Sequence, residues 1–213
     1  MTADRIILRD QLVEHSLPHW GSWSDLIGAG ATPDELGFTC EQARLNRLNA
    51  RYRVARSFRG ITLDSFGPAT VDGYGALFRL FLTWTAFEQY YKGLGLSAAS
   101  RDGWFKVHLP ADIDTRMRIF DPDNRLFKLV VSKVQNDVKT HVDAYLQRSP
   151  YGFTYLPAAL RHLFAHGILT PHANNASPGN VQSLCNLMAD TLLEGLGADF
   201  KTRVQSVVAK RAA

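Results

Sequence analysis

Hydrophobic residues recur at helical spacing along most of this chain, and stretches rich in glycine, proline and polar residues separate those segments. The most regular segment is residues 77–96, where an apolar side chain returns every three or four positions. This period is that of one helix face, so we predict a helix of about twenty residues there. The apolar positions on that face are Leu77, Leu80, Phe81, Trp84, Phe87, Tyr91 and Leu94.

The N-terminal part contains a second amphipathic segment, at residues 39–58. Thr32 and Glu35 precede it with the spacing of a capping box, which indicates a short helix start. The rest of residues 1–38 has no clear period, because glycines interrupt it. The stripe predicted to be buried in residues 39–58 consists of Leu45, Leu48, Tyr52 and Ala55.

The middle of the chain is less regular. We expect residues 97–123 to form an irregular connection with a short extended piece at residues 104–109. A helical period returns in residues 124–147, and Asp121 or Asp123 can cap the start of that helix. Its apolar positions are Leu126, Val130, Val134, Val138 and Leu146.

Two more helices are predicted in the C-terminal part. A short apolar helix precedes Gly167, a residue type that often ends helices in a left-handed conformation, and Pro157 suits its first turn. After a polar loop at residues 170–176, a final helix begins with Ser177 as its cap and Pro178 at its first position. Its buried face is predicted to contain Val181, Leu184, Leu187, Met188 and Leu192.

These segments together predict an all-α protein. The expected architecture is an antiparallel four- to five-helix bundle with an N-terminal helical extension. Residues 60–75 contain Pro68 and several glycines, which mark a boundary between two parts. We therefore expect an N-terminal helical extension at residues 1–69 and a helical bundle at residues 70–213.

Composition agrees with a globular protein, because 46% of the 213 residues are hydrophobic and 21% are charged. The apolar run at residues 77–96 is interrupted by Arg79, Glu88 and Lys92, which argues against a membrane span. No signal-peptide core is recognised near the start, so a cytoplasmic location is the expectation. Cys40 and Cys185 are the two cysteines, and their separation argues against a disulfide framework or a thiolate zinc site.

Positive charge is concentrated in residues 41–60, where six arginines accompany a single acidic residue, Glu41. This stripe is consistent with contacts to nucleic-acid phosphates. A solvated helix face, or pairing with acidic residues elsewhere in the fold, explains it equally well. The stripe consists of Arg44, Arg47, Arg51, Arg53, Arg56 and Arg59.

Candidate chemistry lies at the end of the short helix before Gly167. Arg161 has the planar donor fork that matches phosphate oxygens. His162 and His166 lie four positions apart, nearly on one helix face, and histidine exchanges protons near neutral pH. The role of His166 as acid or base stays open. An alternative is a surface arginine beside a helix-capping histidine.

The arrangement of Arg161, a polar His162 and His166, with four residues between the arginine and His166, resembles the signature of the HEPN superfamily. The long aromatic helix with Trp84 and Glu88, and a terminal helix after a polar loop, agree with the bundle of that family over residues 70–213. The resemblance implies a metal-independent endoribonuclease that acts as a homodimer, with no cofactor and no metal. Many relatives are toxins or antiviral effectors, which implies RNA as substrate and a cognate antitoxin or other protein partner.

Other functions remain open. Some members of that family have lost catalysis, so a non-catalytic helical module that binds nucleotide or a protein partner is the main alternative. His162, His166 and His172 are also candidates for a zinc site, since histidines four apart can share a metal. Glu88 is a candidate for orienting Arg161 or a histidine. A DNA-reading role for the N-terminal extension is less favoured, because no helix-turn-helix spacing is recognised.

Overall fold

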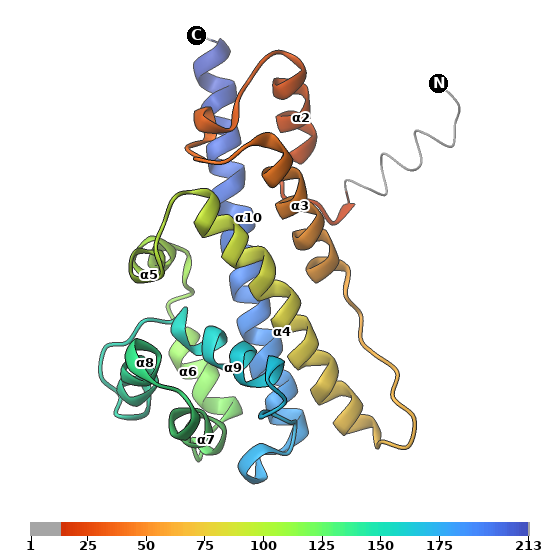
Figure 1. The fold of residues 1–213 in the computed structure, drawn as a ribbon, viewed down its shortest axis with the longest axis vertical. Helices are drawn as coiled ribbons and strands as arrows, with labels where there is room; N and C mark the ends of the chain where they lie inside the picture. Colours follow the sequence, from red (N-terminus) through yellow and green to blue (C-terminus); the bar gives the residue numbers. More distant parts are fainter. Residues whose placement is uncertain (1–13, 213) are drawn as a thin grey trace.

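The computed structural model describes residues 14–212, and this part of the chain folds into helices without strands (Figure 1). The all-α prediction is therefore confirmed. In chain order the elements are α2 (Trp20–Gly28), η1 (Pro33–Leu36), α3 (Gln42–Ser57), α4 (Pro68–Gly93), α5 (Ala98–Phe105), η2 (Lys106–His108), α6 (Ile113–Phe120), α7 (Arg125–Lys133), α8 (Asn136–Leu146), α9 (Tyr155–Ala165), η3 (Ala173–Asn175) and α10 (Pro178–Ala212).

The two longest helices, α4 and α10, pack side by side and run in the same direction (Figure 1). Arg79, near the middle of α4, bonds Asp190 of α10, and Tyr90, nearer the end of α4, bonds Asp199. The residue numbers of the two helices increase in the same direction along the contact, so the pair is parallel. The expected antiparallel arrangement is wrong for these two helices, because the long connection between them carries the chain back to the end where α4 began.

Helices α3 and α9 pack on other sides of α4 and run antiparallel to it. Thr39, just before α3, bonds the carbonyl of Gly93 at the end of α4. In α9, Arg161 bonds Glu88, whereas Phe164 further along contacts Phe78, nearer the start of α4. Helix α4 is thus the central element, and it presents one side to α9.

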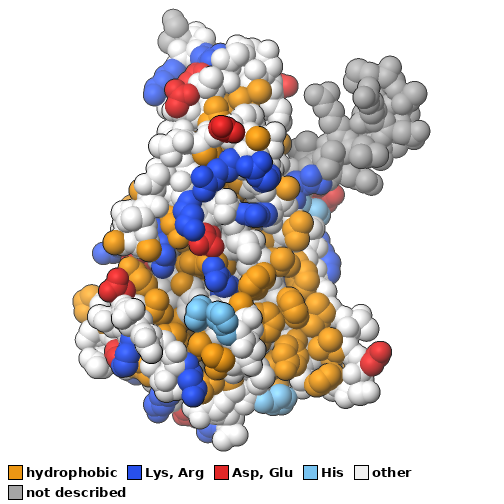
Figure 2. All heavy atoms as spheres, viewed as in Figure 1, with side chains coloured by type: hydrophobic (Ala, Val, Ile, Leu, Met, Phe, Trp, Pro, Cys, Tyr) orange, Lys and Arg blue, Asp and Glu red, His pale blue; other side chains and the backbone are white. Residues whose placement is uncertain are grey.

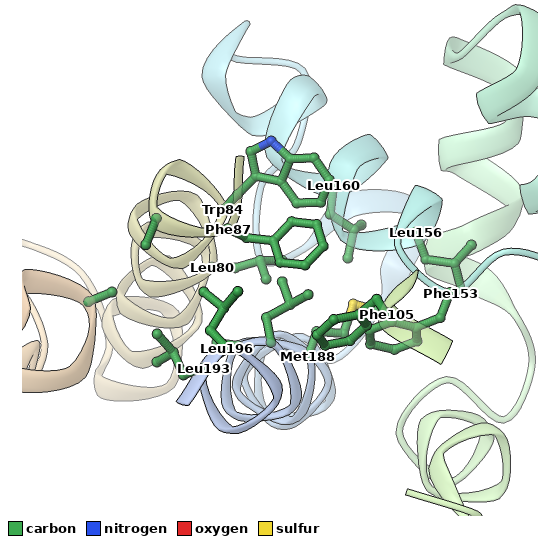
Figure 3. Close-up of a cluster of buried hydrophobic side chains, with 14 of the residues drawn as sticks. Leu80, Trp84, Phe87, Phe105, Phe153, Leu156, Leu160, Met188, Leu193 and Leu196 are labelled. Atoms are coloured by element: carbon green, nitrogen blue, oxygen red, sulfur yellow. The ribbon is translucent and has the colours of Figure 1, made fainter. Parts of the chain in front are cut away.

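The core lies between α4, α9, α10 and the short helix α5 (Figure 3). Phe105 of α5 lies against Phe87 of α4, with ring centres 5.2 Å apart. A side chain at Gly195 of α10 would collide with Phe105, because a Cβ there would lie 2.4 Å from the ring. The fully buried residues that Figure 3 labels in this region include Leu80, Phe87, Leu156, Leu160, Met188, Leu193 and Leu196.

Several expected elements are confirmed. The predicted stripe of α3 is buried, and Thr32 donates its backbone N–H to Glu35 as the capping box requires. The Asp121 carboxylate accepts hydrogen bonds from the backbone N–H groups of Leu126 and Phe127, so it caps α7. Burial nevertheless raises the pKa of Asp121, because desolvation outweighs these hydrogen bonds.

Two expectations for the middle of the chain are wrong. Residues 97–123 are not irregular, since they contain α5 and α6, and the extended piece expected at residues 104–109 is helical. Residues 124–147 form two helices rather than one, with a break at residues 134–135 and a left-handed Asn136. Asparagine tolerates this conformation better than most residues, which permits the sharp break.

Helix α4 begins at Pro68, earlier than the predicted start at residue 77. Gly73 lies inside it, and a Cβ there would come within 2.7 Å of Pro171, so this glycine permits close packing instead of marking a loop.

Apolar residues on both sides of the proposed boundary at residues 69 and 70 contribute to one core. Residues 1–13 of the proposed extension lie outside the described residues. Within residues 14–212, no helix has both the length and the apolar character of a membrane span.

Candidate functional site

The end of α9 has the geometry that its sequence predicts. Helix α9 ends at Ala165, His166 follows it, and Gly167 adopts a left-handed conformation with φ of 70°. The N–H of Ile168 donates to the carbonyl of Leu163, and that of Gly167 donates to Phe164. This pair of bonds is a Schellman motif, which stops the helix and holds His166 at its exposed end.

Arg161 points from α9 toward α4. Its Nη2 donates to Oε2 of Glu88 at 3.1 Å, which confirms Glu88 as a group that orients Arg161. Lys92 bonds the other oxygen of the same carboxylate at 2.8 Å. Burial acts to raise the pKa of Glu88, but the hydrogen bonds and charges of Lys92 and Arg161 together lower it. The guanidinium carbon of Arg161 also lies 5.9 Å from the ring centre of Trp84.

The Nε atom of Arg161 is buried and has no hydrogen-bond partner among residues 14–212. A buried donor without an acceptor is costly and calls for an explanation, such as a ligand, an ion or a water molecule that pairs with it. The guanidinium of Arg161 is therefore fixed on one side by Glu88 and left incomplete on the other.

His162 and His166 lie against each other, with ring centres 4.5 Å apart. Both are exposed. The pKa of His162 is lowered, first by partial desolvation and then by the charges of His166 and Arg161. His162 is thus biased toward the neutral form, in which one ring nitrogen accepts a proton.

Arg161 and His162 line a cleft of about 540 Å³ between α4, α9 and the segment that joins α7 to α8. His166 is not among the residues that line this cleft, so the structure brings Arg161 and His162 together there, whereas His166 contacts His162 from outside the lining. On the face shown in Figure 2, histidine side chains lie between a band of Lys and Arg side chains and a broad apolar area.

Sequence reasoning missed Arg101 of α5, a residue of the cleft that is 5% exposed, and Lys133 at the end of α7. The guanidinium of Arg101 lies close to the rings of three aromatic residues, and its Nε donates to Oγ1 of Thr154 at 3.2 Å. In the sequence, Arg101 lies three residues before the aromatic pair at residues 104–105, which is the spacing of neighbours on one helix face. The expectation of an irregular segment there hides this spacing.

A larger hollow of about 900 Å³ lies elsewhere, along α6 and residues 148–151, and contains none of the predicted site residues. One of its two arginines, Arg118, is paired with Asp114, to which Nε and Nη2 donate at 2.8 and 3.1 Å. The cleft with Arg161 is the better candidate although it is smaller, because it contains two of the predicted site residues, Arg161 and His162.

The zinc alternative finds no support in the positions of its ligands. His172 does not join His162 and His166, because its Nε2 lies 3.0 Å from Oγ1 of Thr70. In the part of the chain that the structure describes, no three His, Cys, Asp or Glu residues are grouped to hold a metal ion.

None of the arginines of the stripe lines this cleft. Arg47, Arg51, Arg56 and Arg59 are exposed, and none of the stripe's six arginines forms an ion pair with a described carboxylate. Pairing with acidic residues elsewhere in the fold thus does not explain the stripe within residues 14–212.

Comparisons with protein-family models, with curated proteins and with solved structures found no match for this chain.

Proposed function

We propose that the protein is a metal-independent endoribonuclease of the HEPN type, which cleaves RNA by attack of the ribose 2′-hydroxyl. The observation that carries this proposal is the shared cleft, where a cation suited to phosphate lies beside a histidine biased toward its neutral form. A base and a group that stabilises the phosphate charge are two of the three functions that the reaction requires in the absence of a metal, the third being an acid for the leaving oxygen.

His162 is the better candidate for the base, because a neutral imidazole accepts the proton of the 2′-hydroxyl. The 2′-oxygen then bonds to phosphorus, and the bond from phosphorus to the 5′-oxygen breaks. Arg161 stabilises the negative charge on the phosphate oxygens. A protonated histidine, His166 in this assignment, supplies a proton to the departing 5′-oxygen, and a 2′,3′-cyclic phosphate remains.

Arg161 can offer a phosphate the donors that Glu88 does not use, or exchange its bond to Glu88 for one to phosphate when RNA binds. Glu88 keeps Lys92 as a partner during that exchange, since the two side chains are bonded independently of Arg161. The carboxylate is therefore not left unpaired. This arrangement lets Arg161 turn toward a ligand at a modest cost.

Because His166 lies outside the cleft of its own chain, we propose that the active form is a homodimer in which the tips of two α9 helices meet. An apolar surface beside the histidines supports this arrangement. Phe78 is 42% exposed and packs edge-on against Phe164, and Ile168 is 46% exposed. A second copy packed on these residues would place His166 near the partner's cleft.

A toxin or antiviral defence protein, restrained by a cognate antitoxin or another protein, is the biological setting that we propose. Expression in growing cells should then arrest growth, and His166→Ala should relieve the arrest. The alternative function is a non-catalytic module that binds nucleotide or a protein partner. The position of His166 outside the cleft favours this alternative if the protein is monomeric.

The decisive experiment incubates purified protein with a defined RNA in the presence of EDTA and identifies the new ends by mass spectrometry. We expect cleavage with cyclic phosphate ends, and no cleavage of DNA, which lacks the 2′-hydroxyl. Arg161→Ala, His162→Ala and His166→Ala should each reduce the rate by about 10²-fold or more. His172→Ala is the matched control, because this histidine bonds Thr70 away from the cleft. Full activity in the Arg161→Ala or His166→Ala variant would refute the assignment.

A further inference from the structure

Arg101 is held rigidly inside the cleft. Its guanidinium carbon lies 4.9 Å from the ring centre of Tyr155, 5.2 Å from that of Trp84 and 5.4 Å from that of Tyr91. The hydrogen bond from its Nε to Thr154 fixes its orientation as well. Aromatic faces attract a cation, so the three rings form a cage for this guanidinium.

The charge of Arg101 has no counter-ion within residues 14–212, where none of the ion pairs involves it. The adjacent Asp102 does not serve, since its Oδ1 accepts hydrogen bonds from the backbone and hydroxyl of Thr154 at 2.8 and 3.0 Å. Buried charges in proteins are normally paired. An arginine residue that is 95% buried, has no counter-ion and lines a cleft therefore indicates that an anion completes its surroundings.

The rest of the cleft agrees with an anionic ligand. Arg161 and Lys133 add two positive charges to that of Arg101, and Glu88 is the single carboxylate among the described residues that line it. Glu88 is already bonded by Arg161 and by Lys92. An approaching anion therefore meets an excess of positive charge.

We propose that Arg101 binds a phosphate group of RNA, in addition to the phosphate that Arg161 holds at the site of cleavage. The planar fork of arginine fits phosphate oxygens, and a cation fixed in advance loses little freedom on binding. The ligand class is a single-stranded oligoribonucleotide with at least two phosphates in the cleft. The choice of RNA rests on the proposed function, whereas the binding step itself requires no cleavage.

The test uses a short fluorescent 2′-O-methyl oligoribonucleotide, which has no 2′-hydroxyl nucleophile and so reports binding alone. Its affinity for the wild-type protein and for Arg101→Gln is measured by fluorescence anisotropy at several salt concentrations. Arg116→Gln is the matched control, because it removes the same charge from an exposed position of α6 outside the cleft. We expect Arg101→Gln to weaken binding about tenfold or more and to reduce the slope of log affinity against log salt by about 0.7.

Unchanged affinity and salt slope in Arg101→Gln, or equal losses in Arg101→Gln and Arg116→Gln, would overturn the proposal. So would failure of the wild-type protein to bind the oligonucleotide, including the case in which inorganic phosphate alone binds. Circular dichroism establishes that each variant is folded. Should Arg101→Gln not fold, Arg101→Lys decides: it keeps the charge but lacks the fork, so weaker binding supports the proposal and unchanged binding overturns it.

The outcome is independent of the cleavage assay. Binding that depends on Arg101, without cleavage of unmodified RNA, would support this inference and reject the nuclease. Cleavage of unmodified RNA with the same KM in wild type and Arg101→Gln would leave the nuclease intact and reject the role of Arg101.

Discussion

Arg203 and Arg161 are equally exposed, at 26% of each side chain, yet their surroundings differ. Arg203 donates from Nε to Asp199 at 2.6 Å and from Nη1 to the carbonyl of Leu36 at 2.8 Å. Arg161 makes one hydrogen bond, to Glu88, and its buried Nε has no partner among the described residues. The contrast shows that two arginines of equal exposure can differ in how many acceptors the fold supplies to them.

The residues around each arginine show the same contrast. Asp199 also accepts a hydrogen bond from the buried Tyr90 hydroxyl at 2.7 Å, and its other oxygen lies 3.7 Å from Nε2 of His108; we call the hydrogen-bonded group of Tyr90, Asp199 and Arg203 the Asp199 cluster. Burial, with the nearby Asp199 charge, raises the pKa of Tyr90 well above its usual value. The Asp199 cluster joins α4 to α10 and satisfies its own charges. The cleft on the α9 side of α4 has more cations than carboxylates.

The largest expected effect comes from comparing two isosteric substitutions, Asp199→Asn and Glu88→Gln. Asp199 is 13% exposed and accepts from two partners, so we expect Asp199→Asn to lower the free energy of unfolding by about 2–3 kcal/mol. Glu88 is 27% exposed, and its ion pairs are near solvent, so Glu88→Gln should cost less than about 1 kcal/mol. Urea denaturation measures both. Equal losses would break the distinction between a structural and a ligand-binding arginine.

The second largest effect is expected at Gly195 of α10, which packs against Phe105 of α5. Gly195→Ala should destabilise the protein by about 1–3 kcal/mol, because the new methyl group collides with Phe105. Phe105 lies on α5, the helix that carries Arg101, so oligonucleotide binding should weaken as well. Gly179→Ala, which meets no atom closer than 3.8 Å in the same helix, is the control and should be neutral or stabilising. A Gly195→Ala protein with wild-type thermal stability would contradict the packing described here.

The smallest effect concerns the proton on His162. His166→Ala should raise the pKa of His162, because one repelling charge is removed, but desolvation should keep it below the usual value near 6.5. In the wild type, the unfolded chain binds this proton more readily than the folded one. The contribution of His162 to stability is therefore present at neutral pH and is lost as the pH falls below about 6.5. An NMR titration of the imidazole signals measures the shift, and a lower pKa in the variant would exclude repulsion by His166.

Much of the helical structure follows from the sequence pattern. The predictions agree with the structure where a periodic segment is long, as in α3 and α4, or where a residue type marks a helix end, as Gly167 does after α9. The two helices α5 and α6 were missed, since each has eight residues and a helix that short is not stable without tertiary contacts. Their buried residues Phe105 and Met117 supply those contacts.

The candidate site was predictable in part. Arg161 and His162 were identified because they lie next to each other in the sequence at a helix end. The pairing of Arg161 with Glu88 was anticipated from α4, although they are 73 positions apart. Arg101 was not identified, since the rings of its cage come from α4 and α9 and surround it after the chain has folded. The break between α7 and α8 was hidden because apolar residues keep their four-residue spacing across it.

The parallel arrangement of α4 and α10 has a consequence for synthesis of the chain. The Tyr90 and Asp199 partners are separated by 109 positions, which gives the central helix pair a high contact order. At ribosomal rates α4 emerges about ten seconds before α10 is complete. Throughout that interval, the nascent chain carries an aromatic helix whose main partner has not yet been made.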